Sequence, residues 1–216
     1  MPSASDRIHQ AALRLFAERS TTQVTVSELA EAAGVARGTV YSNIRDVDSL
    51  FEDVAARLVT EMDAETAVAT PPGADPAQQF AVAIRMFIRR AHVEPLWGRF
   101  LVRFGIAMPA LREVLEGRAR SDLQLGIDLG RFQIRPVQIP SVIAMLSGSV
   151  AAACSLVIDG QLTWRESGVD TAELFLRTIG VPSDTAHFLA RSELPPLPPL
   201  DDGSRGATKK APPTSQ

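Results

Sequence analysis

Polar side chains between Arg37 and Asn43 are of types that bind the edges of DNA bases. The Arg37 guanidinium can donate a pair of hydrogen bonds to guanine, and Asn43 or Ser42 can reach base edges or phosphates. The methyl group of Thr39 suits thymine, and Gly38 would let the backbone approach closely. The run predicts a helix that enters a DNA major groove.

Two short helices from about Val24 to Asn43 are expected to position these side chains. The first begins at a capping box, because the Thr25 hydroxyl can bind the Glu28 amide while Glu28 reaches back. It ends at Gly34, where a left-handed conformation favours a residue without a β-carbon. The hydroxyls of Thr25 and Tyr41 are then placed to bind phosphates, which fixes register without reading sequence.

A helix before this pair completes a small core. It is expected to begin near Ser3 or Ser5, to end by Arg19, and to bury a stripe of residues spaced three and four apart. Short helices are not stable alone, so the three form a bundle from which the segment 37–43 projects. The spacing alone is also compatible with simple helix packing.

Charge gives no support to a nucleic-acid partner. The chain carries a formal net charge of −3, and within residues 1–55 five arginines face eight acidic residues. The DNA prediction therefore rests on geometry.

The fold class is all-α, because helical spacing recurs along the chain and no run alternates with period two. A fourth helix is expected from Asp46, as N-cap, to the Pro/Gly cluster at 70–73. Further helices are expected at 75–92, after Pro95, after Pro109, and at 141–158, 170–179 and 183–191.

The segment Ser141–Ile158 carries no charge and approaches the length of a transmembrane helix. Its four serines and its glycine favour instead a buried helix packed closely on a neighbour, so no membrane partner is expected. The N-terminus lacks the pattern of a signal peptide, and a cytoplasmic location is expected.

Aromatic and methionine side chains on the central helices are candidates for a ligand pocket as a group, although for each one alone a place in the core is the favoured reading. They are Phe87, Trp97, Phe100, Phe104, Met108 and Met145, with Arg103 and Gln124 as polar partners.

No cofactor, metal or catalytic residue is expected. The three histidines lack metal-binding spacing, and the chain has no phosphate-binding loop or nucleophile elbow. The single cysteine, Cys154, is interpreted as a packing residue, with an oxidation sensor as the alternative.

The run TVSELAEAAGVARGTVYSNIRDVDSLFEDV resembles the DNA-binding domain of the tetracycline-repressor (TetR) family of bacterial regulators. The residues that match the family pattern are Thr25, Ala33, Gly34, Val35, Gly38, Thr39, Tyr41 and Leu50. The resemblance implies a DNA-binding domain at residues 1–55 and a helical ligand-binding and dimerisation domain at 56–193. The Pro- and Gly-rich residues 194–216 are expected to form a disordered tail.

Two positions depart from the family pattern. Ile44 stands where the family usually has Phe, which is a tolerable change in a core. Val47 stands where the family usually has a phosphate-binding Lys, so Arg45 or the first amides of the fourth helix would have to substitute.

The leading hypothesis is a homodimeric repressor that binds operator DNA and is released by an unknown small molecule. The alternative is a helical ligand-binding or interaction module with weakened DNA binding, which the charge and Val47 favour. An enzyme is the third and least favoured reading.

Overall fold

The computed structural model describes residues 3–19, 22–44, 46–70, 73–105 and 109–194. These residues form α-helices and one 3-10 turn and contain no strand, which confirms the all-α prediction. The helices are α1 (Ala4–Arg19), α2 (Val26–Ala33), α3 (Arg37–Asn43), α4 (Leu50–Ala69), α5 (Pro76–Val93), α6 (Pro95–Phe104), α7 (Pro109–Asp128), α8 (Ile139–Ile158), α9 (Trp164–Thr178) and α10 (Ser183–Arg191), and the turn η1 is Pro136–Gln138.

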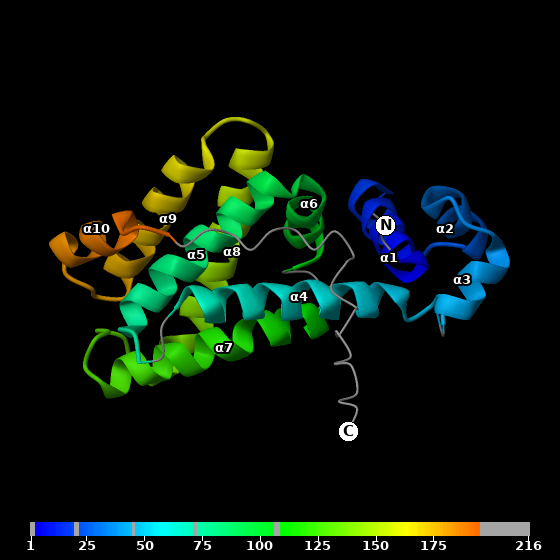
Figure 1. The fold of residues 1–216 in the computed structure, drawn as a ribbon. Coiled ribbons are helices and arrows are strands. Elements are labelled where there is room, and N and C mark those ends of the chain that lie inside the picture. The colour runs from blue at the N-terminus through cyan, green and yellow to red at the C-terminus, as the bar shows by residue number, and fades with distance from the viewer. Residues whose placement is uncertain (1–2, 20–21, 45, 71–72, 106–108, 195–216) are drawn as a thin grey trace, which may run out of the picture.

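The helices form two bodies joined by the long helix α4 (Figure 1). Helices α1–α3 make a small bundle at one end, and α5 and α7–α10 form the larger bundle at the other. The first half of α4 packs in the core of the small bundle, which also receives Phe100 and Phe104 from α6. Helix α6 therefore belongs to both bodies.

The helix-turn-helix is built as its sequence predicts. The Thr25 Oγ1 accepts a 3.3 Å hydrogen bond from the Glu28 amide, and the Thr25 amide donates to the Glu28 carboxylate at 2.8 Å. Gly34 follows α2 with φ = 62°, in the left-handed region. This turn reverses the chain between α2 and α3, so that α3 packs against α1 and α2 through Val40.

Two helix starts differ from expectation. α4 begins at Leu50, because the Asp46 carboxylate accepts a bond from the Asp48 amide and makes a turn of its own. α9 begins at Trp164, six residues before the expected start at Asp170, because Thr163 and Glu166 form a second capping box.

A buried arginine of α5 forms ion pairs with two glutamates of α4. Arg90 is only 4% exposed, and its guanidinium lies 3.0 Å from Glu61, 2.9 Å from Glu65 and 3.1 Å from Glu94. Burial raises the pKa of Glu65 and of Glu94, and the charge of Arg90 opposes this shift.

The apolar helix α8 is covered only in part. Pro136–Ile158 is long and apolar enough to cross a membrane by length and composition alone, a test that core helices of soluble proteins also pass. It packs against α5, α6, α7 and α9, yet Ser141, Met145, Ser149 and Ala152 are exposed. Burial on all sides, expected from the sequence, is thus not reached within one chain.

The predicted tail lies outside the described residues from 195 onward. Leu194, its first residue, is half-buried and packs against the core of the larger bundle.

Candidate nucleic-acid interface and ligand cavity

Helix α3 gathers the predicted base-reading residues on one exposed surface. Val40 is fully buried and anchors α3 to the small bundle, whereas Tyr41 is 69% exposed. Arg37, Gly38, Ser42 and Asn43 are likewise exposed, and Thr39 is half-buried. Arg45 lies outside the described residues.

The polar groups of α3 differ in how free they are to bind a partner. The Ser42 hydroxyl and the Asn43 amide both donate to the Thr39 carbonyl, at 3.1 Å and 2.8 Å. Arg37 makes no hydrogen bond or ion pair with the described residues, so its guanidinium can turn to an incoming acceptor.

Thr25 is more constrained than expected. Its hydroxyl donates to the Glu28 carboxylate at 2.7 Å, and Glu28 also pairs with Arg19 at 2.5 Å. These bonds to Thr25 hold the pKa of Glu28 below its usual range. A phosphate contact from the Thr25 hydroxyl would require this hydrogen bond to open.

Arg7 supports the turn in a way that the sequence did not reveal. Its Nη2 donates to the carbonyls of Ala33 and Gly34, at 2.7 Å and 2.6 Å, and so satisfies acceptors at the C-terminal end of α2. Because 26 residues separate Arg7 from Ala33, only the tertiary fold shows this contact.

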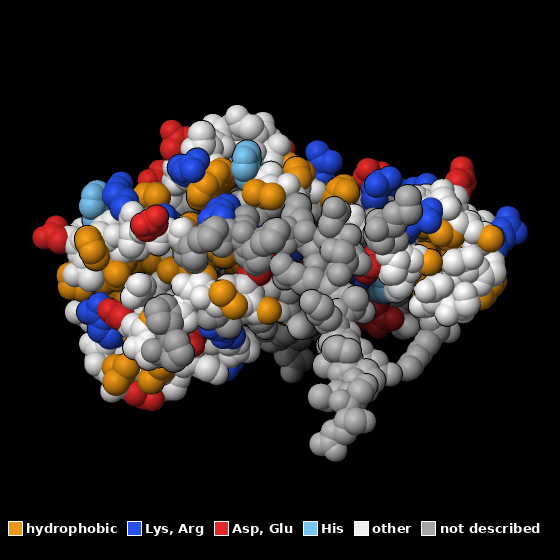
Figure 2. Space-filling model, viewed as in Figure 1, with side chains coloured by type: hydrophobic (Ala, Val, Ile, Leu, Met, Phe, Trp, Pro, Cys, Tyr) orange, Lys and Arg blue, Asp and Glu red, His pale blue; other side chains and the backbone are white. Residues whose placement is uncertain are grey.

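The two departures from the TetR pattern are packing positions. Ile44 is 8% exposed within the core of the small bundle, and Val47 is half-buried against the same core. Val47 therefore contributes apolar contacts where a Lys would extend toward phosphate. On the face seen in Figure 2, basic and acidic side chains are interspersed over the α1–α3 end.

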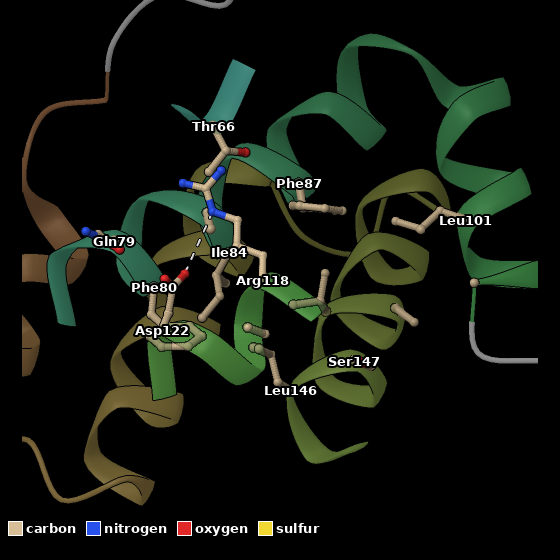
Figure 3. Close-up of a pocket in the computed structure, with 15 residues that line it drawn as sticks. Thr66, Gln79, Phe80, Ile84, Phe87, Leu101, Arg118, Asp122, Leu146 and Ser147 are labelled. Atoms are coloured by element: carbon tan, nitrogen blue, oxygen red, sulfur yellow. Dashed lines mark ion pairs between the residues drawn. The ribbon is translucent and has the colours of Figure 1, made fainter. Parts of the chain in front are cut away.

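A partly open cavity of about 130 Å³ is lined by residues of α4–α8 (Figure 3). Its lining residues are Thr66, Gln79, Phe80, Ala83, Ile84, Phe87, Leu101, Gly105, Arg118, Ala119, Asp122, Leu146, Ser147, Val150 and Ala151. The wall is mainly apolar with a few polar groups, the usual character of a small-molecule site.

An ion pair supplies the charged groups of this cavity. Arg118 Nε lies 3.8 Å from the Asp122 carboxylate, one turn along α7, and both point into the space shown in Figure 3. Burial raises the pKa of Asp122, and Arg118 opposes that shift. The Thr66 hydroxyl donates to the Met62 carbonyl at 2.8 Å and the Gln79 amide to the Ala74 carbonyl at 3.1 Å, so both retain acceptor oxygens.

Of the eight side chains expected to line a pocket, Phe87 alone lines this cavity among those described. Trp97 packs behind Phe87, with ring centroids 5.7 Å apart. Phe100 and Phe104 pack against Phe51 of α4 inside the core of the small bundle, with ring centroids 5.2 Å and 4.9 Å away. Their helix is the expected one, but these rings lie on its other face.

The remaining expected residues also lie elsewhere. Arg103 donates to the Ala17 carbonyl of α1, Gln124 donates to Asp128 on its own helix, and Met145 is 37% exposed on α8. Met108 lies outside the described residues. The charged groups at the cavity are instead those of Arg118 and Asp122, which their i,i+4 spacing beside the apolar Leu123 could have indicated.

Cys154 is fully buried, and this burial raises the pKa of its thiol to about 12. Because the thiolate is the reactive form, the environment supports packing rather than redox sensing.

Two family models match the chain. "Bacterial regulatory proteins, tetR family" matches residues 8–54, and "Tetracyclin repressor-like, C-terminal domain" matches residues 75–192. Two uncharacterized HTH-type transcriptional regulators of Mycobacterium tuberculosis are each 30% identical over 92 residues, 43% of this chain and 46% of the relative. That match spans about half the length of these relatives. AcrR of Shigella flexneri is 40% identical over 43 residues, 20% of each chain.

Solved structures resemble nearly the whole fold. RolR in complex with resorcinol is 28% identical, with a TM-score of 0.63 over 90% of this chain and 96% of that one. RolR without ligand is also 28% identical, with a TM-score of 0.66 over 89% of this chain and 100% of that one. A TetR regulator from Shewanella sp. PV-4 is 18% identical, with a TM-score of 0.71 over 83% and 100%, and shares the fold. With both halves of the chain matched by its models, this protein belongs to the TetR family of transcriptional regulators.

Proposed function

We propose that the protein is a homodimeric repressor that binds a near-palindromic operator through α3 and leaves it when a small molecule fills the cavity. The exposed surface of α3 carries this proposal: Arg37 is unpaired among the described residues, and Tyr41 stands out from a helix anchored by Val40. Two such helices, one from each protomer, would enter successive major grooves. The site of action is then the cytoplasm, where operator DNA lies.

The exposed face of α8 supports the dimer. This helix carries no charge, and an added Cβ at Gly148 would meet no atom within 4 Å, so a second helix can approach closely there. Leu174 of the neighbouring α9 is 60% exposed. A second copy of the chain that covers α8 would complete the burial that its composition requires.

The ligand we propose is a single aromatic ring that carries hydroxyl groups. A free volume of about 130 Å³ suits a molecule of that size, since an apolar cavity of about 150 Å³ binds benzene. A ring hydroxyl can donate to the Asp122 carboxylate while Phe80, Ile84 and Phe87 contact the ring. The structure of RolR with resorcinol supports this class.

Helix α6 provides the route from ligand to DNA. Leu101 and Gly105 line the cavity, whereas Phe100 and Phe104 of the same helix are buried in the core of the small bundle. A ligand that displaces α6 must therefore shift the small bundle, and with it the separation of the two recognition helices.

The decisive experiment measures fluorescence anisotropy of labelled DNA from upstream of the gene, titrated with the full chain at low and high salt. We expect saturable binding that weakens steeply with salt and is lost in Arg37→Ala and Tyr41→Ala. If the anisotropy of this DNA did not change at low salt, the proposal that the protein represses from that site would be wrong.

Val47→Lys separates this function from an interaction module with weakened DNA binding. A large gain in affinity would show a working DNA reader that lacks one phosphate contact. Little change would favour the interaction module, since no DNA phosphate would then lie within reach of position 47.

A further inference from the structure

A second, open hollow of about 700 Å³ lies between α5, the start of α9 and the end of α10. Its basic lining consists of Arg85, Arg89, Arg165 and Arg191, around the indole of Trp164. It shares no lining residue with the ligand cavity, because Ala83, Ile84 and Phe87 of α5 line that cavity while Arg85 and Arg89 line the hollow. Figure 2 shows basic side chains gathered where the N-terminal end of α9 lies beside α5.

Two of the guanidinium groups lie over one indole ring. Arg165 lies 4.4 Å and Arg89 lies 5.6 Å from the centroid of Trp164. Arg85 is only 8% exposed, and its Nη1 donates to the Ser192 carbonyl at 2.6 Å. Cation–π contacts position Arg89 and Arg165, and the hydrogen bond to Ser192 positions Arg85.

Two arginines of this hollow have no carboxylate partner among the described residues. Neither Arg85 nor Arg165 forms an ion pair with a described carboxylate, although Glu193 is part of the lining. Arg191 is engaged by Glu173 at 2.5 Å. The pKa of Arg85 is lowered by burial and then by Arg89. The pKa of Arg89 is lowered by burial and then by Arg165, and Glu65 opposes this shift.

Like charges held together in a partly desolvated hollow repel one another, and an anion bound among them removes that repulsion. Planar guanidinium groups bind the paired oxygens of phosphate and carboxylate with two parallel hydrogen bonds. We propose that Arg85, Arg89 and Arg165, arranged around Trp164, form a second binding site for a small molecule that carries a phosphate or carboxylate group. This site is independent of the aromatic ligand and lies on the opposite side of α5.

The test uses the full chain labelled with ¹⁵N, because its two tryptophans report on separate places. Inorganic phosphate and succinate are titrated separately, each against sodium chloride at equal ionic strength. We expect the indole N–H signal of Trp164, assigned with Trp164→Phe, to shift and saturate, whereas that of the 2% exposed Trp97 stays in place. The anion that saturates at the lower concentration identifies the preferred group.

Arg165→Gln and Arg177→Gln form a matched pair, since both remove one exposed arginine from α9 but only Arg165 lines the hollow. Loss of one charge-assisted contact should weaken anion binding about tenfold in Arg165→Gln and less than about twofold in Arg177→Gln. Equal weakening in both variants would show general charge attraction and overturn the site. Shifts that never saturate with either anion would also overturn it.

Discussion

Arg103 of α6 donates a 2.7 Å hydrogen bond from Nη1 to the main-chain carbonyl of Ala17 in α1. Ala17 lies in the last turn of α1, where carbonyl groups have no partner within the helix. A cation from the helix that borders the ligand cavity thus caps a helix of the DNA-binding bundle. This bond and the Phe51–Phe104 contact give α6 both polar and apolar attachments to that bundle.

Arg103→Ala should loosen the end of α1. The lost bond is worth about 1 kcal/mol, so the free energy of unfolding in urea should fall by that order. Hydrogen exchange of the amides near Ala17 should accelerate in parallel. Arg99→Ala is the control, because Arg99 is exposed on the same helix and makes no bond to the described residues. Equal effects of both variants would argue against a specific cap.

Gly38→Ala should change stability and DNA affinity in opposite directions. An added Cβ at Gly38 would meet no atom within 4 Å, and Ala favours a helix over Gly by about 1 kcal/mol, so thermal stability should rise. DNA affinity should nevertheless fall, because the methyl group would stand between α3 and the groove. Gly117→Ala on α7 offers the same free space, and its anisotropy titration should match that of the parent chain. Full affinity in Gly38→Ala would place Gly38 outside the interface.

Asp122→Asn should weaken the binding of a hydroxylated ring. Resorcinol serves as the probe in calorimetry, and loss of a charged acceptor should raise its Kd about tenfold. Asp128→Asn is the matched control, because it removes a carboxylate from the same helix at an exposed position outside the cavity lining. The Kd for resorcinol should stay unchanged in this control. If resorcinol bound both variants equally well, Asp122 would not contact the ligand.

Gly148→Arg should produce a monomer. The new side chain would place a charge on the uncharged face of α8 that we propose as the dimer interface, and an added Cβ at Gly148 meets no atom within 4 Å in one chain. Light scattering after gel filtration measures the mass directly. Gly117→Arg introduces the same group at an open position of α7 and should leave the dimer intact. A dimeric Gly148→Arg would move the interface elsewhere.

The sequence predicted the helix-turn-helix well because its determinants are local. The capping box of Thr25 and Glu28 and the left-handed Gly34 depend on neighbours along the chain, and both are found in the structure. A local signal of the same kind, Thr163 with Glu166, could have placed the start of α9 correctly.

The ligand site could not be predicted with the same success, because it depends on which face of each helix turns inward. Trp97, Phe100 and Phe104 lie on the expected helix, yet aromatic side chains fit a core as readily as a cavity wall. The contacts of Arg7 and Arg103 join segments distant in sequence, and no local pattern indicates them.

The ion pair between Asp75 and Arg131, which joins the start of α5 to the segment after α7, should make the stability of the fold depend on pH in acid. The hydrogen bond from Arg131 holds the pKa of Asp75 below its usual range. The unfolded chain therefore takes up this proton first, so the pair stabilises the fold above about pH 4 and this stabilisation is lost as pH falls further. Both side chains are about one third exposed, so the effect on Tm should be small.

Asp75→Asn isolates this effect, because the amide oxygen can still cap the Ala77 amide as the carboxylate does at 3.0 Å. The Tm of the variant should lie below that of the parent at pH 6, and the difference should narrow progressively as the pH falls below about 4. Asp170→Asn, an exposed position on α9, should show no such convergence. A Tm difference for Asp75→Asn that stayed constant from pH 6 to pH 3 would show that the charge of Asp75 does not cause it.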